Sequence, residues 1–555
     1  MSAVLTAQEP SAKYLANLQP PLVRHFDLIA QAPGGVARLR ELILTLAVQG
    51  KLVLQDASDE PASELLKKIR AEKDRLIAEG KIKRSKLQIE ISADEKPFVI
   101  PTDWAWIRLG ESMEMLNGKA FKPSDWLPSG LPIVRIQNLN KLEASFNYCD
   151  PETISEKNKI NDGSFLISWS GTPGTSFGAF IWQRGAAALN QHIFKCELIG
   201  HAFVPEFLKL SINSQLNVLI AKAQGGVGLQ HVTKGTLESL ILVLPPLAEQ
   251  SRIVTRVEEL MQLCDALEVS GQLEAKQHAQ LVSTLLGTLT QSETPEALAD
   301  NWQRLATHFD VLLDRPEAVD AVEQTILQLA VRGLLVPQDP TDEPANVLLQ
   351  KIRTEKDHLI AQGKIKRDKP LPPITGEEKP FGLPQGWAWV RLNDLIRIGS
   401  GDGLTAAQMA PNGTIPVYGG NGVNGHHDQA NVDEPTVVIG RVGYYCGSVH
   451  ITPASAWVTD NAFITRYPKS YLEMEWLYWL LVGTNLKEND SATAQPVISG
   501  RKLYPIVVAL PPHLEQSRIV TRINELRSLC ADLRERLQSE KSLQVQLASA
   551  IIQAR

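Results

Sequence analysis

Two stretches of this 555-residue chain gather side chains that could read the edges of nucleic-acid bases. Arg and Lys form paired hydrogen bonds with guanine, and Asn and Gln form them with adenine. In the first stretch we predict base or backbone contacts by Arg135, Gln137, Asn138, Asn140, Thr172, Gln191, His192, Gln230 and His231. In the second we predict them for Tyr418, Asn421, Asn424, Arg441, Tyr444, Tyr445, Asn461, Arg501 and Lys502. Loops also use Asn for turn geometry, so none of these residues identifies a site by itself.

The sequence offers little for catalysis or for binding a cofactor. Residues 420–425 match GxGxxG, but two histidines follow where a dinucleotide site needs an apolar helix. We therefore interpret these residues as a glycine-rich loop. The sequence contains neither a GxxxxGK[ST] motif nor the Asn/Asp-Pro-Pro-aromatic tetrapeptide of amino-methyltransferases. His426-His427 has no second histidine pair at metal-ligand spacing, and the acidic residues form no nuclease-type cluster. We therefore predict a non-catalytic chain with no metal or cofactor of its own.

A repeated framework surrounds the two stretches. Residues 25–52 return as 308–335 and residues 59–84 as 342–367, both at an offset of 283. Residues 244–260 return as 510–526, but at an offset of 266, so the first half carries 17 additional residues between the repeated blocks. The sequences between the blocks barely match. Such a chain is most simply a device that presents two different binding surfaces on one repeated scaffold.

Apolar residues after each Leu-Pro-Pro indicate two long helices with coiled-coil seams, because they recur in steps of four and three. The predicted seams are Ile253, Val257, Leu260, Cys264 and Leu267, then Ile519, Ile523, Leu526, Cys530 and Leu533. We expect them to continue at Leu281, Leu285 and Leu289, and at Leu543, Leu547 and Ile551. The helices either pair with each other or are two ordinary core helices, since neither shows four clean heptads.

A short amphipathic helix is predicted within residues 61–80, with apolar residues at helical spacing and lysines and arginines on the rest of its surface. A basic run, Lys-Ile-Lys-Arg, follows at 81–84 and returns at 364–367. Such a run fits either a solvated surface or contacts with phosphates beside each variable stretch.

Composition places the chain among ordinary globular proteins, with 43% hydrophobic and 21% charged residues. Its formal net charge of −6 disfavours indiscriminate nucleic-acid binding, so a DNA-binding surface would have to be local. No apolar run approaches a membrane span, and the first ten residues lack the pattern of a secretory signal. The five cysteines are widely spaced without CxxC pairs, which argues against disulfides. We expect a cytoplasmic protein.

The fold class predicted is α+β, with two mixed α/β modules joined by two long antiparallel coiled-coil helices in a pseudo-twofold internal repeat. Short β-rich stretches such as those at 131–136, 163–169 and 435–443 mark the modules. The predicted domains are an N-terminal helical frame (1–106), a first module (107–243), a first spacer helix (244–292), a central helical frame (293–389), a second module (390–510) and a second spacer helix (511–555).

These features together resemble the specificity subunits of type I restriction-modification enzymes. The resemblance rests on LPPLAEQ at 244–250 with Ile253-Val254, and on LPPHLEQ at 510–516. GGVGLQHV at 225–232, PIVRIQN at 132–138 and PVYGGNG at 416–422 look like motifs of the family's target-recognition domains. Blocks at 43–53 and 59–62 suggest the branch with long N-terminal and central regions.

The resemblance implies that each target-recognition domain reads one half of a split, asymmetric DNA site and that the helices set the spacer between the halves. It also implies docking of two modification subunits, which use S-adenosylmethionine, and of restriction subunits, which use ATP and Mg²⁺. Gln495-Pro496 lies one residue out of register with Gln230-His231, and His513 replaces an apolar residue. These departures blur which loop residues correspond.

Two other functions compete with this one. An enzyme with its own site in a variable module would turn over substrate as an isolated chain, but the absent motifs disfavour it. A coiled-coil scaffold joining two protein-binding modules would favour apolar anchors, whereas these loops are rich in Asn, Gln and Arg.

Overall fold

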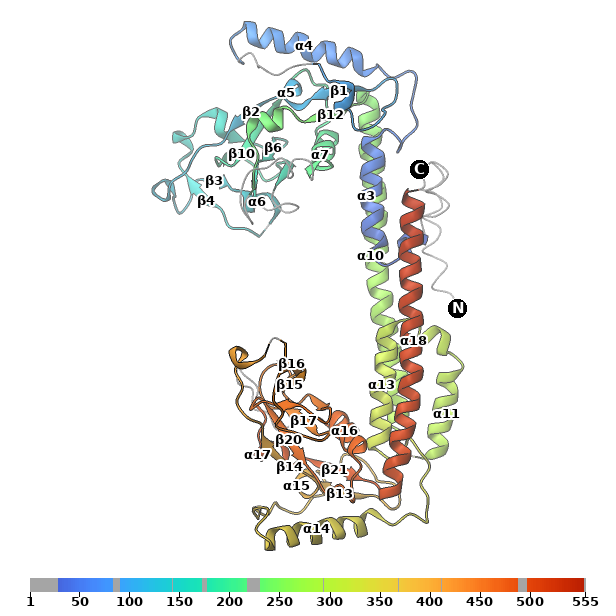
Figure 1. Ribbon diagram of the computed structural model, residues 1–555. Coiled ribbons are helices and arrows are strands. Elements are labelled where there is room, and N and C mark those ends of the chain that lie inside the picture. The colour runs from blue at the N-terminus through green and yellow to red at the C-terminus, as the bar shows by residue number, and fades with distance from the viewer. Residues whose placement is uncertain are drawn as a thin grey trace. The chain divides into compact units, whose positions relative to one another are not determined.

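The computed structural model describes residues 28–82, 90–141, 143–171, 177–216, 230–292, 294–367, 369–410, 412–487 and 497–553. The chain divides into two compact units. The first comprises residues up to Gln272 together with Lys541–Arg555, and the second comprises Leu273–Glu540. Helices and strands occur together in each unit (Figure 1), which confirms the predicted mixed α/β character.

The first unit begins with two framework helices and continues into a β-rich module. Its helices are α3 (Gly35–Val48), α4 (Ala62–Ala78), α5 (Leu109–Ser112), α6 (Ile136–Asn140), α7 (Pro205–Asn213) and α9 (Lys234–Glu238). Its strands are β1 (Ala105–Arg108), β2 (Met113–Asn117), β3 (Leu131–Val134), β4 (Asn147–Cys149), β5 (Lys159–Ile160), β6 (Phe165–Ser168), β7 (Ser170–Gly171), β8 (Gly178–Ile181), β9 (Ala187–Leu189), β10 (Ile193–Leu198), β11 (Gln230–His231) and β12 (Ile241–Leu244).

Two four-stranded sheets form most of the first module, in the orders β2-β10-β6-β8 and β4-β3-β9-β5. Strands β3 and β9 run parallel, with Val134 opposite Leu189, while their other neighbours are antiparallel. The module is closed at its base by the antiparallel pair β1 and β12. Parallel strands end at one edge of a sheet, so the loops after β3 and β9 emerge together.

The second unit also combines helices with short strands. Its helices are α11 (Pro295–Ala306), α12 (Phe309–Leu312), α13 (Pro316–Val331), α14 (Ala345–Ala361), α15 (Leu392–Leu395), α16 (Met474–Gly483) and α17 (Gly500–Leu503). Its strands are β13 (Ala388–Arg391), β14 (Arg397–Ser400), β15 (Ile415–Gly419), β16 (Gly422–His427), β17 (Val437–Gly440), β18 (Val449–Ile451), β19 (Trp457–Val458), β20 (Ala462–Arg466) and β21 (Val507–Leu510). Short 3-10 helices lie at Ala93–Glu95, Pro123–Asp125, Pro151–Thr153, Glu156–Asn158 and Ala406–Gln408.

Sheet topology in the second module matches that of the first at several points. A four-stranded sheet has the order β14-β20-β17-β18, and β13 pairs with β21 at the base. The three-stranded sheet β16-β15-β19 contains a parallel pair, β15 and β19, with Tyr418 opposite Val458. The GxGxxG match falls on the β15–β16 hairpin, in agreement with a glycine-rich loop rather than a dinucleotide site.

Two long helices, α10 (Leu247–Thr290) and α18 (His513–Gln553), each contribute to both units. The start of α10 is buried in the core of the first unit through Ile253, Val257, Leu260 and Cys264, and that core also contains Ala548 near the end of α18. The start of α18 is buried in the core of the second unit through Ile519, Ile523 and Cys530, together with Val282, Leu286 and Leu289 from the end of α10. Leu267, Leu526 and Leu533 pack against these cores and are half-buried.

The continuation of the predicted seams is correct in part: Leu289 is buried and Leu285 and Ile551 pack against the cores, whereas the other three predicted residues are exposed. Leu281 is 50% exposed while Val282 is buried, and Leu543 and Leu547 are 63% and 51% exposed while Ala548 is buried. A straight α-helix has 3.6 residues per turn, so its apolar face drifts by roughly 20° per heptad relative to a 3.5-residue repeat. The drift accounts for the exposure of Leu281 and Leu547, whose neighbours Val282 and Ala548 are buried instead.

The same anchoring contacts fasten each module to the start of a long helix. Trp104 Nε1 donates to Glu249 Oε2 at 2.9 Å in the first unit, and Trp387 Nε1 donates to Glu515 Oε2 at 3.0 Å in the second. Burial raises the pKa of both carboxyl groups, against the opposing effect of the hydrogen bonds they accept. Gly50 has a positive φ, and a Cβ there would lie 3.1 Å from Trp104. The same Trp–Glu pair thus forms in both units although the sequence separation is 145 residues in one and 128 in the other, which indicates a common packing arrangement.

Ion pairs at equivalent places reinforce these anchors. Arg252 on α10 pairs with Asp59 at 2.6 Å, and Arg518 on α18 pairs with Asp342. Gln250 accepts a hydrogen bond from the backbone N–H of Val204, just as Gln516 accepts one from Glu473. Both Asp carboxylates are almost fully buried. These ion pairs therefore hold the first turns of α10 and α18 in place and are not solvent-exposed surface contacts.

The predicted amphipathic helix is present as α4 and again as α14. Much of its basic surface is balanced locally, because Lys68 pairs with Glu60 and Arg75 with Glu72 and Glu79. Of the first Lys-Ile-Lys-Arg run, Lys83 and Arg84 lie outside the described residues. All five cysteines are buried and free. No helix in the described ranges is long and apolar enough to cross a membrane.

Candidate nucleic-acid interface

In the second module, the ends of two parallel strands bring distant loops together. The backbone N–H of Thr459, just after β19, donates to the carbonyl of Tyr418 on β15 at 2.8 Å. Asn421 follows β15 and Asn461 follows β19, so both leave the sheet at this edge and both side chains are exposed. Arg441 joins them from a neighbouring sheet, because its backbone N–H donates to the carbonyl of Asn461 at 2.9 Å. Three predicted base contacts therefore lie in one cluster.

The guanidinium group of Arg441 packs against an aromatic ring. Its guanidinium carbon lies 5.4 Å from the ring centroid of Phe463, and Nη1 donates to the carbonyl of Asp460 at 3.4 Å. A guanidinium stacked in this way loses less freedom when it binds a ligand, because the protein has already oriented it. The sequence-based prediction did not include Phe463. Its position two residues after Asn461, at the start of a buried strand, was the available indication.

Two exposed tyrosines and a basic turn surround this cluster. Tyr444 and Tyr445 are 82% and 56% exposed, and their rings meet edge to face at 5.0 Å. Ile498 donates its backbone N–H to the carbonyl of Arg441 at 2.9 Å, which brings the segment leading to Arg501 and Lys502 beside the same loop. Lys502 Nζ donates to the carbonyl of Val497 at 2.9 Å, while Arg501 is exposed.

Two other predicted residues stand apart from the cluster. Tyr418 is only 9% exposed, its hydroxyl donates to the carbonyl of Ile451 at 3.5 Å, and burial raises its pKa, so the ring is mainly part of the core. Asn424 is exposed on β16, beyond the turn that contains Asn421.

The first module uses the same backbone arrangement. The backbone N–H of Asn190, after β9, donates to the carbonyl of Val134 on β3 at 3.1 Å, which brings Arg135 next to Gln191 and His192. Gln191 is exposed, and its amide lies 3.2 Å from the His192 ring nitrogen Nε2. The rings of His192 and Trp169 lie 5.2 Å apart, and Trp169 donates its backbone N–H to the carbonyl of His192.

Strand β11 adds Gln230 and His231 to this edge at the level of the backbone. It pairs with β7, and Val232 donates its backbone N–H to the carbonyl of Trp169 at 3.0 Å. Trp169 was missed as a site residue, although its position at the end of the predicted β-rich stretch 163–169 could have revealed it. Thr172 lies outside the described residues.

The remaining predicted residues lie on helix α6 or directly before it, and they fall into an exposed group and a buried group. Gln137 and Asn140 are exposed and free to meet a ligand, while Arg135 is half-buried with Nη2 donating to the carbonyl of Ser145 at 3.4 Å. Asn138 is 2% exposed, and its amide binds the backbone of Arg135, Ala144 and Ser145. Its hydrogen-bonding capacity is used to shape the loop, so it positions its neighbours.

Both clusters present side chains that can form hydrogen bonds with a ligand and stack on it. Among the residues that the structure describes, no group of three His, Cys, Asp or Glu side chains is placed to hold a metal ion. What the loops present is exposed amide, guanidinium and aromatic surface on rigid strand ends. Such groups suit hydrogen bonding to base edges and stacking.

Comparison with known proteins gives the family. Residues 101–276 and 384–540 match the type I restriction modification DNA specificity domain. The chain belongs to this family. It is 34% identical to the specificity subunit of the Escherichia coli type I restriction enzyme EcoAI and 33% identical to that of EcoEI, in each case over 94% of both chains. A solved structure of the HsdS subunit from Thermoanaerobacter tengcongensis is 18% identical over 82% of this chain and 97% of that chain, with a TM-score of 0.41.

Membership of the specificity-subunit family confirms two predictions made from the residues. The chain is a component for recognising a DNA target, and it is a non-catalytic one that needs no cofactor itself. It also acts together with partner subunits of a type I restriction-modification complex.

Proposed function

We propose that each module of this specificity subunit reads one half of a bipartite, asymmetric DNA site. The observation that carries the proposal is the pair of clusters at the ends of parallel strands, around Arg135 and His192 in one module and around Arg441 and Asn461 in the other. Their backbones are hydrogen-bonded alike and their side chains differ. Unlike readers on like scaffolds favour a site whose two halves have different sequences.

The residues proposed to contact DNA in the first module are Arg135, Gln137, Asn140, Gln191 and His192, with Thr172, Gln230 and His231 remaining predictions. Those proposed in the second are Asn421, Asn424, Arg441, Tyr444, Tyr445, Asn461, Arg501 and Lys502. Asn138 and Tyr418 are proposed to support them, because both side chains are largely buried.

The long helices are proposed to form an antiparallel coiled-coil pair that sets the spacer between the half-sites. The burial of the start of α10 with the end of α18 in one core, and of the end of α10 with the start of α18 in the other, supports this arrangement. The recurring anchors at Trp104 and Trp387 support a pseudo-twofold relation and the domain limits 1–106, 107–243, 244–292, 293–389, 390–510 and 511–555.

The partners proposed are two modification subunits, which bind S-adenosylmethionine, and restriction subunits, which use ATP and Mg²⁺, in the cytoplasm. The recurrence of the framework in both halves supports two equivalent docking surfaces, one for each modification subunit.

Exchange of one module tests the proposal. Residues 107–243 would be replaced by the equivalent module of a related specificity subunit, and the methylated DNA motif would be mapped with the modification subunit present. We expect one half of the motif to change and the other half, with the spacer, to stay. A change in both halves would contradict independent reading by the two modules.

A further inference from the structure

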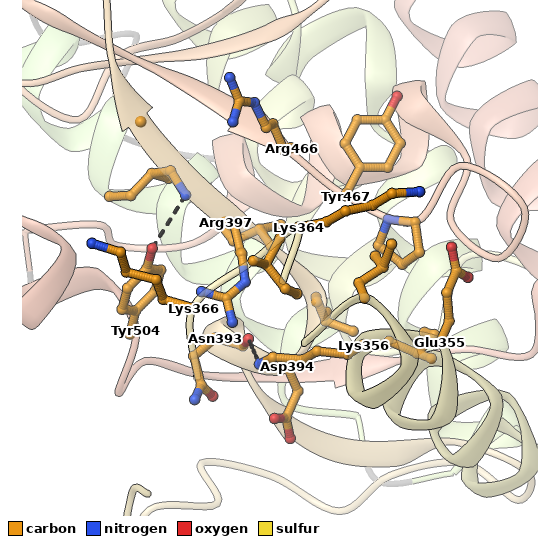
Figure 2. A pocket seen from close by; sticks show the side chains of 18 residues that line it. Glu355, Lys356, Lys364, Lys366, Asn393, Asp394, Arg397, Arg466, Tyr467 and Tyr504 are labelled. Carbon is orange, nitrogen blue, oxygen red and sulfur yellow. Dashed lines mark hydrogen bonds between the residues drawn. The ribbon is translucent and has the colours of Figure 1, made fainter. Parts of the chain in front are cut away.

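A strongly basic pocket of about 560 Å³ lies in the second unit, between α14 with its following turn and one end of the β14–β20 strand pair (Figure 2). Five cationic side chains line it, against two carboxylates, Glu355 and Asp394. The cations are Lys356, Lys364, Lys366, Arg397 and Arg466. None of these residues belongs to the proposed base-reading clusters.

The positive charge of the pocket is poorly balanced from within the protein. Asp394 is already engaged by Arg353 at 2.8 Å. The side chains of Lys364, Lys366 and Arg466 have no counter-ion or hydrogen-bond partner among the described residues, and all three are exposed. Their charges are therefore available to an anion that enters the pocket.

Strand pairing places two of the cations in this pocket beside each other. Arg397 lies directly opposite Arg466 in the antiparallel register, so their side chains share one face of the sheet. Like charges at such positions destabilise a sheet. Tyr504 adds a donor, because its hydroxyl oxygen accepts the backbone N–H of Ile398 at 3.2 Å and its own hydrogen is left for another acceptor.

The equivalent place in the first unit carries the opposite charge. Glu114 lies opposite Glu197 in the β2–β10 pair, at the positions that Arg397 and Arg466 occupy in β14–β20. Here the charges are satisfied internally, since Lys234 contacts Glu114 at 3.1 Å and Lys195 contacts Glu197 at 3.5 Å. The two arginines of the basic pocket therefore have no counterpart at the equivalent described positions of the first unit, although its lysines belong to the repeated framework.

We propose that this pocket is a binding site for a phosphate group, carried by a nucleotide or by a nucleic-acid backbone. Lysine and arginine side chains with a tyrosine O–H donor match the several acceptor oxygens of a phosphate ester, and a volume near 560 Å³ suits a compact ligand. The base-reading loops leave the opposite end of the same strands, where Gly401 donates its backbone N–H to the carbonyl of Ala462. The ligand of this pocket is therefore recognised by its charge and not by its base sequence.

The test uses the full chain and three phosphate probes, namely inorganic phosphate, ATP, and a DNA duplex that lacks the methylated motif. Calorimetric titration would compare the wild type with Lys364→Glu/Arg466→Glu. Lys81→Glu is the matched control, because Lys81 has the position of Lys364 in the first unit and already pairs with Glu79. We expect the double variant to bind at least one probe about tenfold more weakly and the control to bind like the wild type.

The probes separate the possible sources of the phosphate. Weakened binding of ATP or inorganic phosphate identifies a free phosphate ligand, and weakened binding of the duplex alone identifies a nucleic-acid backbone. Unchanged affinity for all three probes overturns the proposal. If the double variant does not fold, Arg466→Gln replaces it in the test. This single variant removes the like-charge pair and should still weaken binding of the same probe about threefold. These variants should leave the methylated motif unchanged, so failure here is distinct from failure of base recognition.

Discussion

The two modules share a backbone arrangement and differ in the side chains mounted on it. Trp169 and His192 in the first module, and Arg441 and Asn461 in the second, are joined by the same hydrogen bond from a backbone N–H to a carbonyl. A second backbone bond then reaches Trp169 from Val232 and Arg441 from Ile498. Because backbone atoms hold these loops in place, their side chains can change without loss of the fold. That freedom is what a protein needs if its DNA target is to diverge.

The framework differs from the modules in this respect, because its side chains, and not only its backbone contacts, are the same in the two units. Trp104 with Glu249 and Trp387 with Glu515 are buried hydrogen-bonded pairs at the base of each module. A substitution in such a pair leaves a buried polar group without its partner, which costs about 1 to 3 kcal/mol. The framework should therefore respond alike in the two units, and the reading surfaces should respond independently.

The largest losses of stability, and similar ones in the two units, are expected when a buried side chain of a helix seam is truncated. Ile253→Ala and Ile519→Ala each remove a side chain that is at most 2% exposed. Each should lower the free energy of unfolding by about 2 to 5 kcal/mol, because a cavity replaces packed methyl groups. Thermal and urea unfolding of the full chain would measure both, with the exposed Leu543→Ala as control. A large loss for one and none for the other would show that the two seams are not equivalent.

The buried carboxylates should give a smaller, pH-dependent effect. Glu249→Gln and Glu515→Gln should each cost about 1 to 3 kcal/mol, since the amide cannot accept both hydrogen bonds that the carboxylate accepts. Burial raises both carboxyl pKa values, so the folded state binds more protons and the wild type loses stability as pH rises above the ordinary Glu pKa. The glutamine variants lack this loss, so their deficit should shrink with rising pH. Urea unfolding between pH 4 and pH 8 tests the sign, and a deficit that grows with pH would contradict it.

Changes in the reading clusters should separate the two half-sites. Asn461→Ala should relax recognition at one position of one half-site by about 1 to 3 kcal/mol and leave the other half untouched. His192→Ala should do the same for the other half. Binding of the assembled complex to duplexes mutated in one half at a time would measure this. If either variant relaxed both halves, the clusters would not be independent readers.

The smallest effects are expected at the exposed ion pairs of α4 and α14. Lys68 pairs with Glu60 and Lys351 with Glu343, and all four side chains are about half exposed. Lys68→Ala and Lys351→Ala should each change the unfolding free energy by less than about 1 kcal/mol. A larger, salt-insensitive loss in either helix would indicate that its pair supports the core.

Sequence patterns predicted much of this molecule because many of its determinants are local. Apolar steps of four and three predicted α10 and α18, and the Leu-Pro-Pro motifs lie just before both helix starts. Alternating and apolar stretches predicted β3, β6 and β17 in the same way. Such patterns depend on residues within a few turns of each other, which a single sequence displays.

What escaped prediction depends on pairing between distant residues. The strand register that places Arg397 opposite Arg466 joins segments about 70 residues apart. The sequence near either residue does not indicate this pairing. Asn138 was predicted to contact DNA, yet its amide is taken up by nearby backbone groups, a competing use open to any Asn in a loop. Residue type alone did not distinguish these two uses.

Methylation mapping by single-molecule sequencing tests the central claim most directly. DNA would be taken from a host that expresses this chain with its modification subunit, and from the same host without the chain. A single motif made of two different half-sites at a fixed spacing, present only with the chain, is the predicted result. A motif with two identical halves, or no methylation that depends on the chain in an assembled complex, would contradict reading by two unlike modules.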